Sequence, residues 1–176
     1  MFKKNLLVIA FLLLSNTLYA NDKAVGLAGD ILAALIPIGS YAGTFYMDDS
    51  KGRIAFYKSI GTTVAVTYAL KLSINAPRPD KSNNNSFPSG HTSLTFSSAV
   101  FLHKRYGFKS ALPAYIGAAF VGYSRVYAKK HYTRDVIAGA AIGALSSWFF
   151  TDKLKKIKLN AVVVNNYTTL LVTYKF

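Results

Sequence analysis

The sequence contains no cysteine and no glutamate, and each absence removes a class of chemistry. Without cysteine there is no disulfide framework, thiolate zinc site, iron–sulfur cluster or cysteine nucleophile. All seven acidic residues are aspartates, so catalysis by paired glutamates is also excluded. Charged residues form only 16% of the chain, which excludes a disordered or highly solvated protein.

Acidic residues are scarce, and basic ones are not. The 176 residues include 21 Lys and Arg against 7 Asp, which gives a formal net charge of +14. A length of this order suits one domain, and the 52% hydrophobic content is enough for a sizeable core. The excess positive charge indicates an anionic partner, namely nucleic acid, an anionic lipid surface or a phosphorylated substrate.

The amino terminus has the pattern of a secretory signal peptide over residues 1–20. Lys3 and Lys4 precede an apolar run at 6–14, and Ala20 offers a small residue at a plausible cleavage point. The alternative is an uncleaved first membrane helix, although the run is short of the roughly 20 residues that a span needs. Either way the chain is exported or membrane-inserted, so nucleic acid is not the expected partner.

The next part of the chain, residues 21–158, is predicted to be one helical domain. Its apolar stretches are rich in small residues, which allow the close helix packing common in membranes. We therefore expect an all-α bundle of five to six mostly membrane-embedded helices. A soluble bundle is the alternative, because Asp30, Lys58 and Lys71 lie inside these stretches. The stretches are 24–47, 54–74, 91–106, 111–127 and 136–150.

Three cationic clusters recur between alternate helices, at residues 51–53, 104–109 and 153–158. If successive helices alternate in direction, all three clusters lie on one side, as the positive-inside rule expects of cytoplasmic loops. The segments at 75–89 and 125–134 then lie on the periplasmic side. This pattern predicts an inner-membrane protein whose chemistry faces the periplasm.

The carboxyl-terminal tail, residues 159–176, changes its pattern. Residues 161–164 and 167–174 are rich in Val, Thr and Tyr, and Asn165 with Asn166 can supply a turn. We expect a short β-hairpin. Two strands cannot close a barrel, so a small ribbon packed on the bundle is favoured over an outer-membrane contact.

Three segments carry the candidate chemistry, and two of them supply cations and a helix terminus. The first holds Lys71 near a helix end and Arg78 between two prolines that keep the backbone extended. The second reads Pro88, Ser89, Gly90, His91 before a helical run. Free N–H groups at such a helix start favour an anion, and Gly90 lets a phosphate approach closely.

The third segment supplies Arg125 and a histidine–aspartate pair. His131 and Asp135 are four residues apart, so on a helix they share one face. A carboxylate on one imidazole nitrogen fixes the tautomer and leaves the other nitrogen as a nucleophile or base. The pair alone would more often be a surface ion pair of little energetic value. Together, the three segments supply what phosphoryl transfer through a histidine needs.

The three motifs, in this order from residue 71 to residue 135, resemble the signature of the type 2 phosphatidic acid phosphatase superfamily. They read Lys-x6-Arg-Pro, Pro-Ser-Gly-His and Ser-Arg-x5-His-x3-Asp. The short interval between the first two motifs leaves little room for a substrate-selecting insertion. Size, signal-like start and topology are most similar to bacterial lipid phosphatases, among them those acting on lipid A, phosphatidylglycerophosphate and undecaprenyl pyrophosphate.

The resemblance implies a metal-independent and cofactor-free phosphatase whose partners are a phosphorylated lipid and the membrane. His131 would attack phosphorus, Asp135 would orient it, and His91 would protonate the leaving oxygen and then activate water. The implied phosphate-binding residues are Lys71, Arg78, Ser89, Gly90 and Arg125. His103 lies outside the motifs and is interpreted as structural.

Three other functions stay open from the sequence. A soluble periplasmic acid phosphatase would share the same site. A vanadium haloperoxidase would bind vanadate in the same pocket. A non-catalytic anion-binding or envelope-organising protein would use the hairpin to bind a partner, but it would not need the full set of nucleophile, acid and cations.

Overall fold

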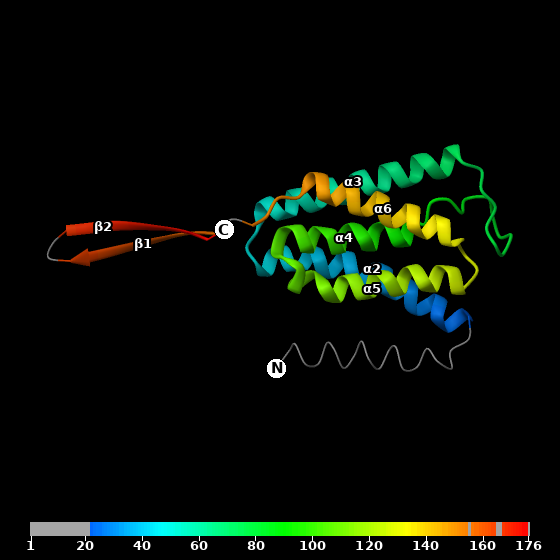
Figure 1. Ribbon diagram of the computed structural model, residues 1–176, viewed down its shortest axis with the longest axis horizontal. Helices are drawn as coiled ribbons and strands as arrows, with labels where there is room; N and C mark the ends of the chain where they lie inside the picture. Colours follow the sequence, from blue (N-terminus) through cyan, green and yellow to red (C-terminus); the bar gives the residue numbers. More distant parts are fainter. Residues whose placement is uncertain (1–21, 155, 165–166, 176) are drawn as a thin grey trace.

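The computed structural model describes residues 22–154, 156–164 and 167–175, so the predicted signal segment 1–20 lies outside it. Five α-helices form the described bundle, as the sequence predicts (Figure 1). In chain order they are α2 (Asp22–Tyr46), α3 (Ser50–Ser73), α4 (Gly90–Tyr106), α5 (Phe108–Tyr127) and α6 (Thr133–Phe150).

Several helices begin up to four residues before the apolar stretches that predict them, because polar residues form their first turns. The start of α3 shows this, since the Asp49 side chain accepts a hydrogen bond from the Gly52 N–H at 2.9 Å and caps the helix. Between α4 and α5 the chain turns at Gly107, whose φ of +92° favours glycine.

Helix α4 lies at the centre of the bundle and contacts all four of the other helices (Figure 1). Its buried side chains are mostly hydroxyls, and these hydrogen-bond across to α3 and α6. Thr67 donates to Ser93 and Thr63 donates to Ser97, both at 3.1 Å, while the Ser147 hydroxyl donates to the Ser97 carbonyl at 2.6 Å. Hydroxyls and small residues therefore form much of the contact between α4 and its neighbours, as in helix packing within membranes.

Glycines on α6 allow this close approach to α4. A Cβ atom on Gly139 would lie 2.4 Å from the Ser89 carbonyl oxygen, and one on Gly143 would lie 2.0 Å from the Ser93 carbonyl oxygen. The backbones of the two helices therefore touch, and no larger residue fits at either position.

The helix directions place the turns at two opposite ends of the bundle. The α2–α3 turn, the α4–α5 turn and the end of α6 lie at one end (Figure 1). Segment 74–89, the α5–α6 connection and the start of α2 lie at the other end, so the chemistry-bearing segments come together there. The predicted alternation of helix directions agrees with this arrangement.

At the opposite end, a buried ion pair joins α4 to the start of α3. The Asp49 carboxylate accepts hydrogen bonds from Arg105 Nε at 2.6 Å, from the other arm of the same guanidinium at 2.5 Å and from the Tyr106 hydroxyl at 2.9 Å. Arg105 is only 7% exposed. The sequence places Arg105 in a cationic cluster of a predicted cytoplasmic loop, whereas in the structure it lies in the last turn of α4 and pairs with Asp49.

Within the described residues, α2 is the one helix whose length and composition both suit a membrane span. The tail is drawn as two antiparallel strands, β1 (Lys156–Val164) and β2 (Tyr167–Lys175), with Val164 opposite Tyr167. The C-terminal hairpin stays a prediction, and so does the embedding of the bundle in a membrane.

Candidate active site

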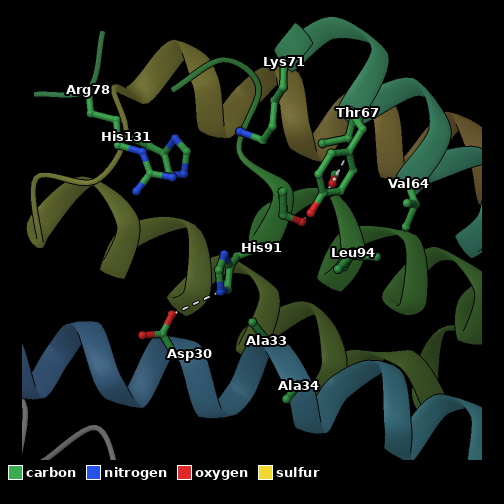
Figure 2. Close-up of a pocket in the computed structure, with 13 residues that line it drawn as sticks. Asp30, Ala33, Ala34, Val64, Thr67, Lys71, Arg78, His91, Leu94 and His131 are labelled. Atoms are coloured by element: carbon green, nitrogen blue, oxygen red, sulfur yellow. Dashed lines mark hydrogen bonds and ion pairs between the residues drawn. The ribbon is translucent and has the colours of Figure 1, made fainter. Parts of the chain in front are cut away.

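A cavity of about 410 Å³ opens at the end of the bundle where the three motif segments meet (Figure 2). One side is lined by the two histidines of the motifs and by two cations. The other side is lined mainly by apolar side chains from α2, α3 and α4. The polar group includes Lys71, Arg78, His91, His131 and the carboxylate Asp30, and the apolar group includes Ala33, Ala34, Val64 and Leu94.

Lys71 and Arg78 are placed by the loop that follows α3. Lys71 Nζ donates to the Asn85 carbonyl at 2.8 Å, and the Arg78 backbone N–H donates to the Asn83 carbonyl at 2.9 Å. The Arg78 Nε atom is buried and has no partner among the described residues. A buried guanidinium N–H without an acceptor is costly, so this donor is ready for an anion in the cavity.

The first turn of α4 forms another part of the cavity wall. Gly90 lines the cavity, and a Cβ atom there would come no closer than 3.9 Å to Lys71 or Thr67. Ser89 precedes Gly90 and is fully buried. Its N–H donates a hydrogen bond to the Asp135 carbonyl at 2.9 Å, and its hydroxyl lies 3.0 Å from the Thr92 hydroxyl. The first N–H groups of a helix have no partner within the helix, so this end of α4 suits an anion in the cavity.

His131 and Asp135 form the buried centre of the site. His131 is 4% exposed and Asp135 is fully buried, with 3.7 Å between His131 Nδ1 and Asp135 Oδ2. That separation is longer than a hydrogen bond, and Nδ1 has no partner among the described residues. Catalytic hydrogen bonds are often long before substrate binds and tighten in the complex.

The environment of His131 keeps its imidazole neutral. Burial lowers the pKa of His131 to about 4, and the positive charges of Lys71 and Arg78 act in the same direction, against the opposing effect of Asp135. A neutral ring carries a free lone pair at physiological pH, which a nucleophile requires.

Ser86 supports Asp135 and has no counterpart in the sequence motifs. Its hydroxyl donates to Asp135 Oδ2 at 2.5 Å, and the Tyr132 N–H donates to the same oxygen at 3.0 Å. These two donors hold the carboxylate on one side of His131. A partner 49 positions away in the sequence leaves no local pattern to detect.

Arg125 does not line the cavity, although the sequence motif assigns it to phosphate binding. One arm of its guanidinium donates to Asp30 Oδ1 at 2.5 Å, and the other donates to the Gly26 carbonyl at 2.5 Å. The same Asp30 oxygen lies 3.1 Å from His91 Nε2 (Figure 2). The structure thus adds Asp30, whose only sequence signal is a carboxylate inside an apolar stretch.

Of the eight residues proposed from the sequence, five line the cavity and three lie directly behind it. The lining residues are Lys71, Arg78, Gly90, His91 and His131. Those behind are Ser89, Arg125 and Asp135, each in contact with a neighbouring element. His103 lies elsewhere, with Nδ1 3.1 Å from the Tyr115 hydroxyl, as a structural residue would. In the described part of the chain, no three His, Cys, Asp or Glu side chains gather as a metal site requires.

The family model of the PAP2 superfamily matches residues 54–158, which include all three motifs. The chain belongs to the PAP2 superfamily. The resemblance drawn from the motifs is therefore confirmed. Within this superfamily, the chain is 32% identical over 138 residues to a lipid A 4'-phosphatase of Helicobacter pylori. That match covers 72% of this chain and 69% of the relative.

Other relatives also match a large part of the chain. A lipid A 1-phosphatase of Porphyromonas gingivalis is 34% identical over 126 residues, but the match covers 66% of this chain and only 28% of that longer protein. A phosphatidylglycerophosphatase B of Bacillus subtilis is 29% identical, with 76% and 74% covered. The crystal structure of Aquifex aeolicus LpxE has the same fold, with a TM-score of 0.64 at 23% identity, covering 73% of this chain and 84% of that one.

Proposed function

We propose that this PAP2 protein is a phosphatase that removes phosphate or pyrophosphate groups from membrane lipids at the periplasmic face of the inner membrane. The observation that carries the proposal is the two-sided cavity. Histidines and cations, with the carboxylate Asp30, line one part of it, and mainly apolar side chains line the other. An amphipathic lipid phosphate matches both sides, whereas a small soluble ester would leave the apolar side unused.

The proposed reaction proceeds through a phosphohistidine. Asp135 faces Nδ1 of His131 at 3.7 Å, and this contact shortens to a hydrogen bond when substrate binds. Nε2 then attacks phosphorus, and a P–N bond forms as the bond to the leaving oxygen breaks. His91 protonates that oxygen. Lys71 and Arg78 bind the phosphate oxygens with the N–H groups at the start of α4, while Ser89 and Arg125 support the site from behind.

The second half-reaction regenerates the enzyme. His91, now neutral, takes a proton from a water molecule, whose oxygen attacks phosphorus as the P–N bond breaks. His131 is released in its original neutral form, and inorganic phosphate leaves. Every step uses side chains that line the cavity or contact one that does.

The outer surface of the bundle supports a membrane location. On α2, a row of large apolar side chains at helical spacing points away from the bundle, and Leu27, Ile31, Leu35 and Ile38 are each more than half exposed. Similar residues are exposed on the other helices, including Leu72, Leu145, Trp148 and Phe149. A soluble protein rarely exposes so much contiguous apolar surface. Basic residues at the opposite end fit cytoplasmic loops.

The test is phosphate release by detergent-purified protein in EDTA. The lipid panel contains phosphatidic acid, phosphatidylglycerophosphate, lipid A and undecaprenyl pyrophosphate, beside one soluble phosphate ester. We expect release from at least one lipid, little from the soluble ester, and loss of release in His131→Ala. His103→Ala is the matched control, because it removes a histidine outside the cavity and should retain activity.

Three other results would lead away from this function. Equal turnover of the soluble ester would indicate a broad acid phosphatase. Halide oxidation dependent on added vanadate would indicate a haloperoxidase. No release from any substrate by folded protein would contradict the proposed function.

A further inference from the structure

Asp30 is a second carboxylate in contact with a histidine of the site. Its Oδ1 atom lies 3.1 Å from His91 Nε2 and accepts a hydrogen bond from Arg125 at 2.5 Å. Figure 2 shows Asp30 on α2, across the cavity end from His131, with the Nε2 edge of His91 turned toward it. Asp30 precedes all three sequence motifs and has no role in the reaction as proposed above.

The position of Asp30 is held by close packing between α2 and α5. Arg125 is 5% exposed, and its guanidinium also donates to the Gly26 carbonyl one turn before Asp30. A Cβ atom on the adjacent Gly29 would lie 1.9 Å from Ser124 Oγ and 2.4 Å from an Arg125 nitrogen. The half-exposed carboxylate of Asp30 is therefore anchored from the interior.

This contact determines which nitrogen of His91 is available to a substrate. A carboxylate accepts hydrogen bonds and donates none, so it selects the His91 form that carries a proton on Nε2. The second ring nitrogen, Nδ1, is then the atom that can lose or gain a proton. In the neutral ring it has a lone pair, and in the charged ring it carries the transferable proton.

The charges around His91 make this carboxylate important. Among the described residues, the ring is acted on by Asp30 from α2, Arg125 from α5, Arg78 from the loop and Lys71 from α3. Three of these groups are cations and one is an anion. Without Asp30, a protonated His91 would face like charges alone, which disfavours the acid form.

We propose that Asp30 is a positioning residue for His91, holding Nε2–H so that Nδ1 exchanges the proton with substrate and water. In the first step Nδ1–H passes its proton to the leaving oxygen as the P–O bond breaks. In the second step the Nδ1 lone pair takes a proton from the attacking water. Both steps rest on the phosphatase function proposed above, and Asp30 keeps its charge throughout.

Leaving-group dependence separates this role from a structural one. The alcohol that leaves phosphatidic acid needs a proton, whereas nitrophenolate leaves p-nitrophenyl phosphate without one. We measure kcat/KM for both substrates, because it reports only the steps up to release of the leaving group. In Asp30→Asn we expect kcat/KM for phosphatidic acid to fall about 100-fold, which is of the order of a general acid's contribution. We expect kcat/KM for p-nitrophenyl phosphate to fall less than tenfold.

Two further comparisons guard against a folding defect. Asp22→Asn makes the same charge change in the first turn of α2, where Asp22 is exposed, and should leave both substrates unaffected. Gly29→Ala displaces Asp30 without altering its charge and should reproduce the selective loss. Gly39→Ala lies on the same helix with nothing within 4 Å and should not.

A double variant tests whether Asp30 acts through His91. If it does, adding Asp30→Asn to His91→Ala leaves the phosphatidic acid rate of the single His91 variant unchanged. Equal losses on both substrates, or no loss in Asp30→Asn, would overturn the positioning role while wild-type turnover still supported the phosphatase. Absence of wild-type turnover would instead contradict the proposed function itself.

Discussion

The contact between α4 and α6 is close enough that one methyl group should displace the site. In Gly139→Ala, the new Cβ atom would lie 2.4 Å from the Ser89 carbonyl oxygen, whereas ordinary contact begins at 3.4 Å. The two helices must therefore separate locally by about 1 Å. Both contacting atoms belong to helix backbone or a rigid methyl, so side-chain rotation cannot relieve the clash.

This displacement acts directly on the catalytic geometry. The Ser89 N–H donates to the Asp135 carbonyl at 2.9 Å, so the contact joins the start of α4, with Gly90 and His91, to the residue proposed to orient His131. A misplacement of about 1 Å can cost on the order of 100-fold in rate. Overpacking costs about 1–3 kcal/mol of stability, and the better helix propensity of alanine offsets about 1 kcal/mol of it.

The assay pairs phosphate release with unfolding of the detergent-solubilised protein. Gly61→Ala on α3 is the matched control, because a Cβ atom there meets nothing within 4 Å. We expect the control to retain activity and to gain about 0.5–1 kcal/mol of stability. Gly139→Ala should lose on the order of 100-fold in kcat/KM with equal or lower stability. Wild-type activity in Gly139→Ala would refute the reasoning, because it would mean that the α4–α6 contact does not hold the site.

Three further predictions concern charge. Asp135→Asn should lower kcat by about 10³-fold or more, because His131 loses both its orientation and the negative charge that stabilises its charged form. A near-normal rate would show that the carboxylate is not needed for catalysis. The acid limb of kcat/KM should lie near the lowered His131 pKa of about 4, since activity needs the neutral ring; a limb near the ordinary value of about 6.5 would contradict this. Arg105→Met should lower the free energy of unfolding by about 3–5 kcal/mol, because Asp49 stays buried without its ion-pair partner. The exposed Lys109→Met is the control and should change this free energy little, with both measured by denaturant unfolding.

The helices and most of the candidate site could be predicted from the sequence, because both depend on local patterns. Apolar runs mark the five helices, and His131 with Asp135 shows the spacing of a shared helix face. The two intervening helices bring His91 and His131 to one end. Boundaries were less predictable, since the polar first turn of α3, capped by Asp49, does not belong to the apolar run.

The contacts that support the site could not be predicted, because they join residues far apart in the chain. Ser86 reaches Asp135 across 49 positions, and Asp30 reaches Arg125 across 95. Arg105 carried a misleading signal, since a basic cluster usually indicates an exposed loop, whereas its guanidinium is buried against Asp49. Only the packing of the helices determines which of these charges are paired.

The central claim is that phosphoryl transfer proceeds through His131, and trapping the intermediate tests it most directly. Protein is incubated with a ³²P-labelled lipid phosphate, quenched under alkaline denaturing conditions, digested and mapped by mass spectrometry. We predict phosphohistidine at His131 and none in His131→Ala. Label should accumulate in His91→Ala when the donor is ³²P-labelled p-nitrophenyl phosphate, because its leaving group needs no proton while hydrolysis by water is slowed. Label on another residue, or undiminished turnover in His131→Ala, would contradict the account.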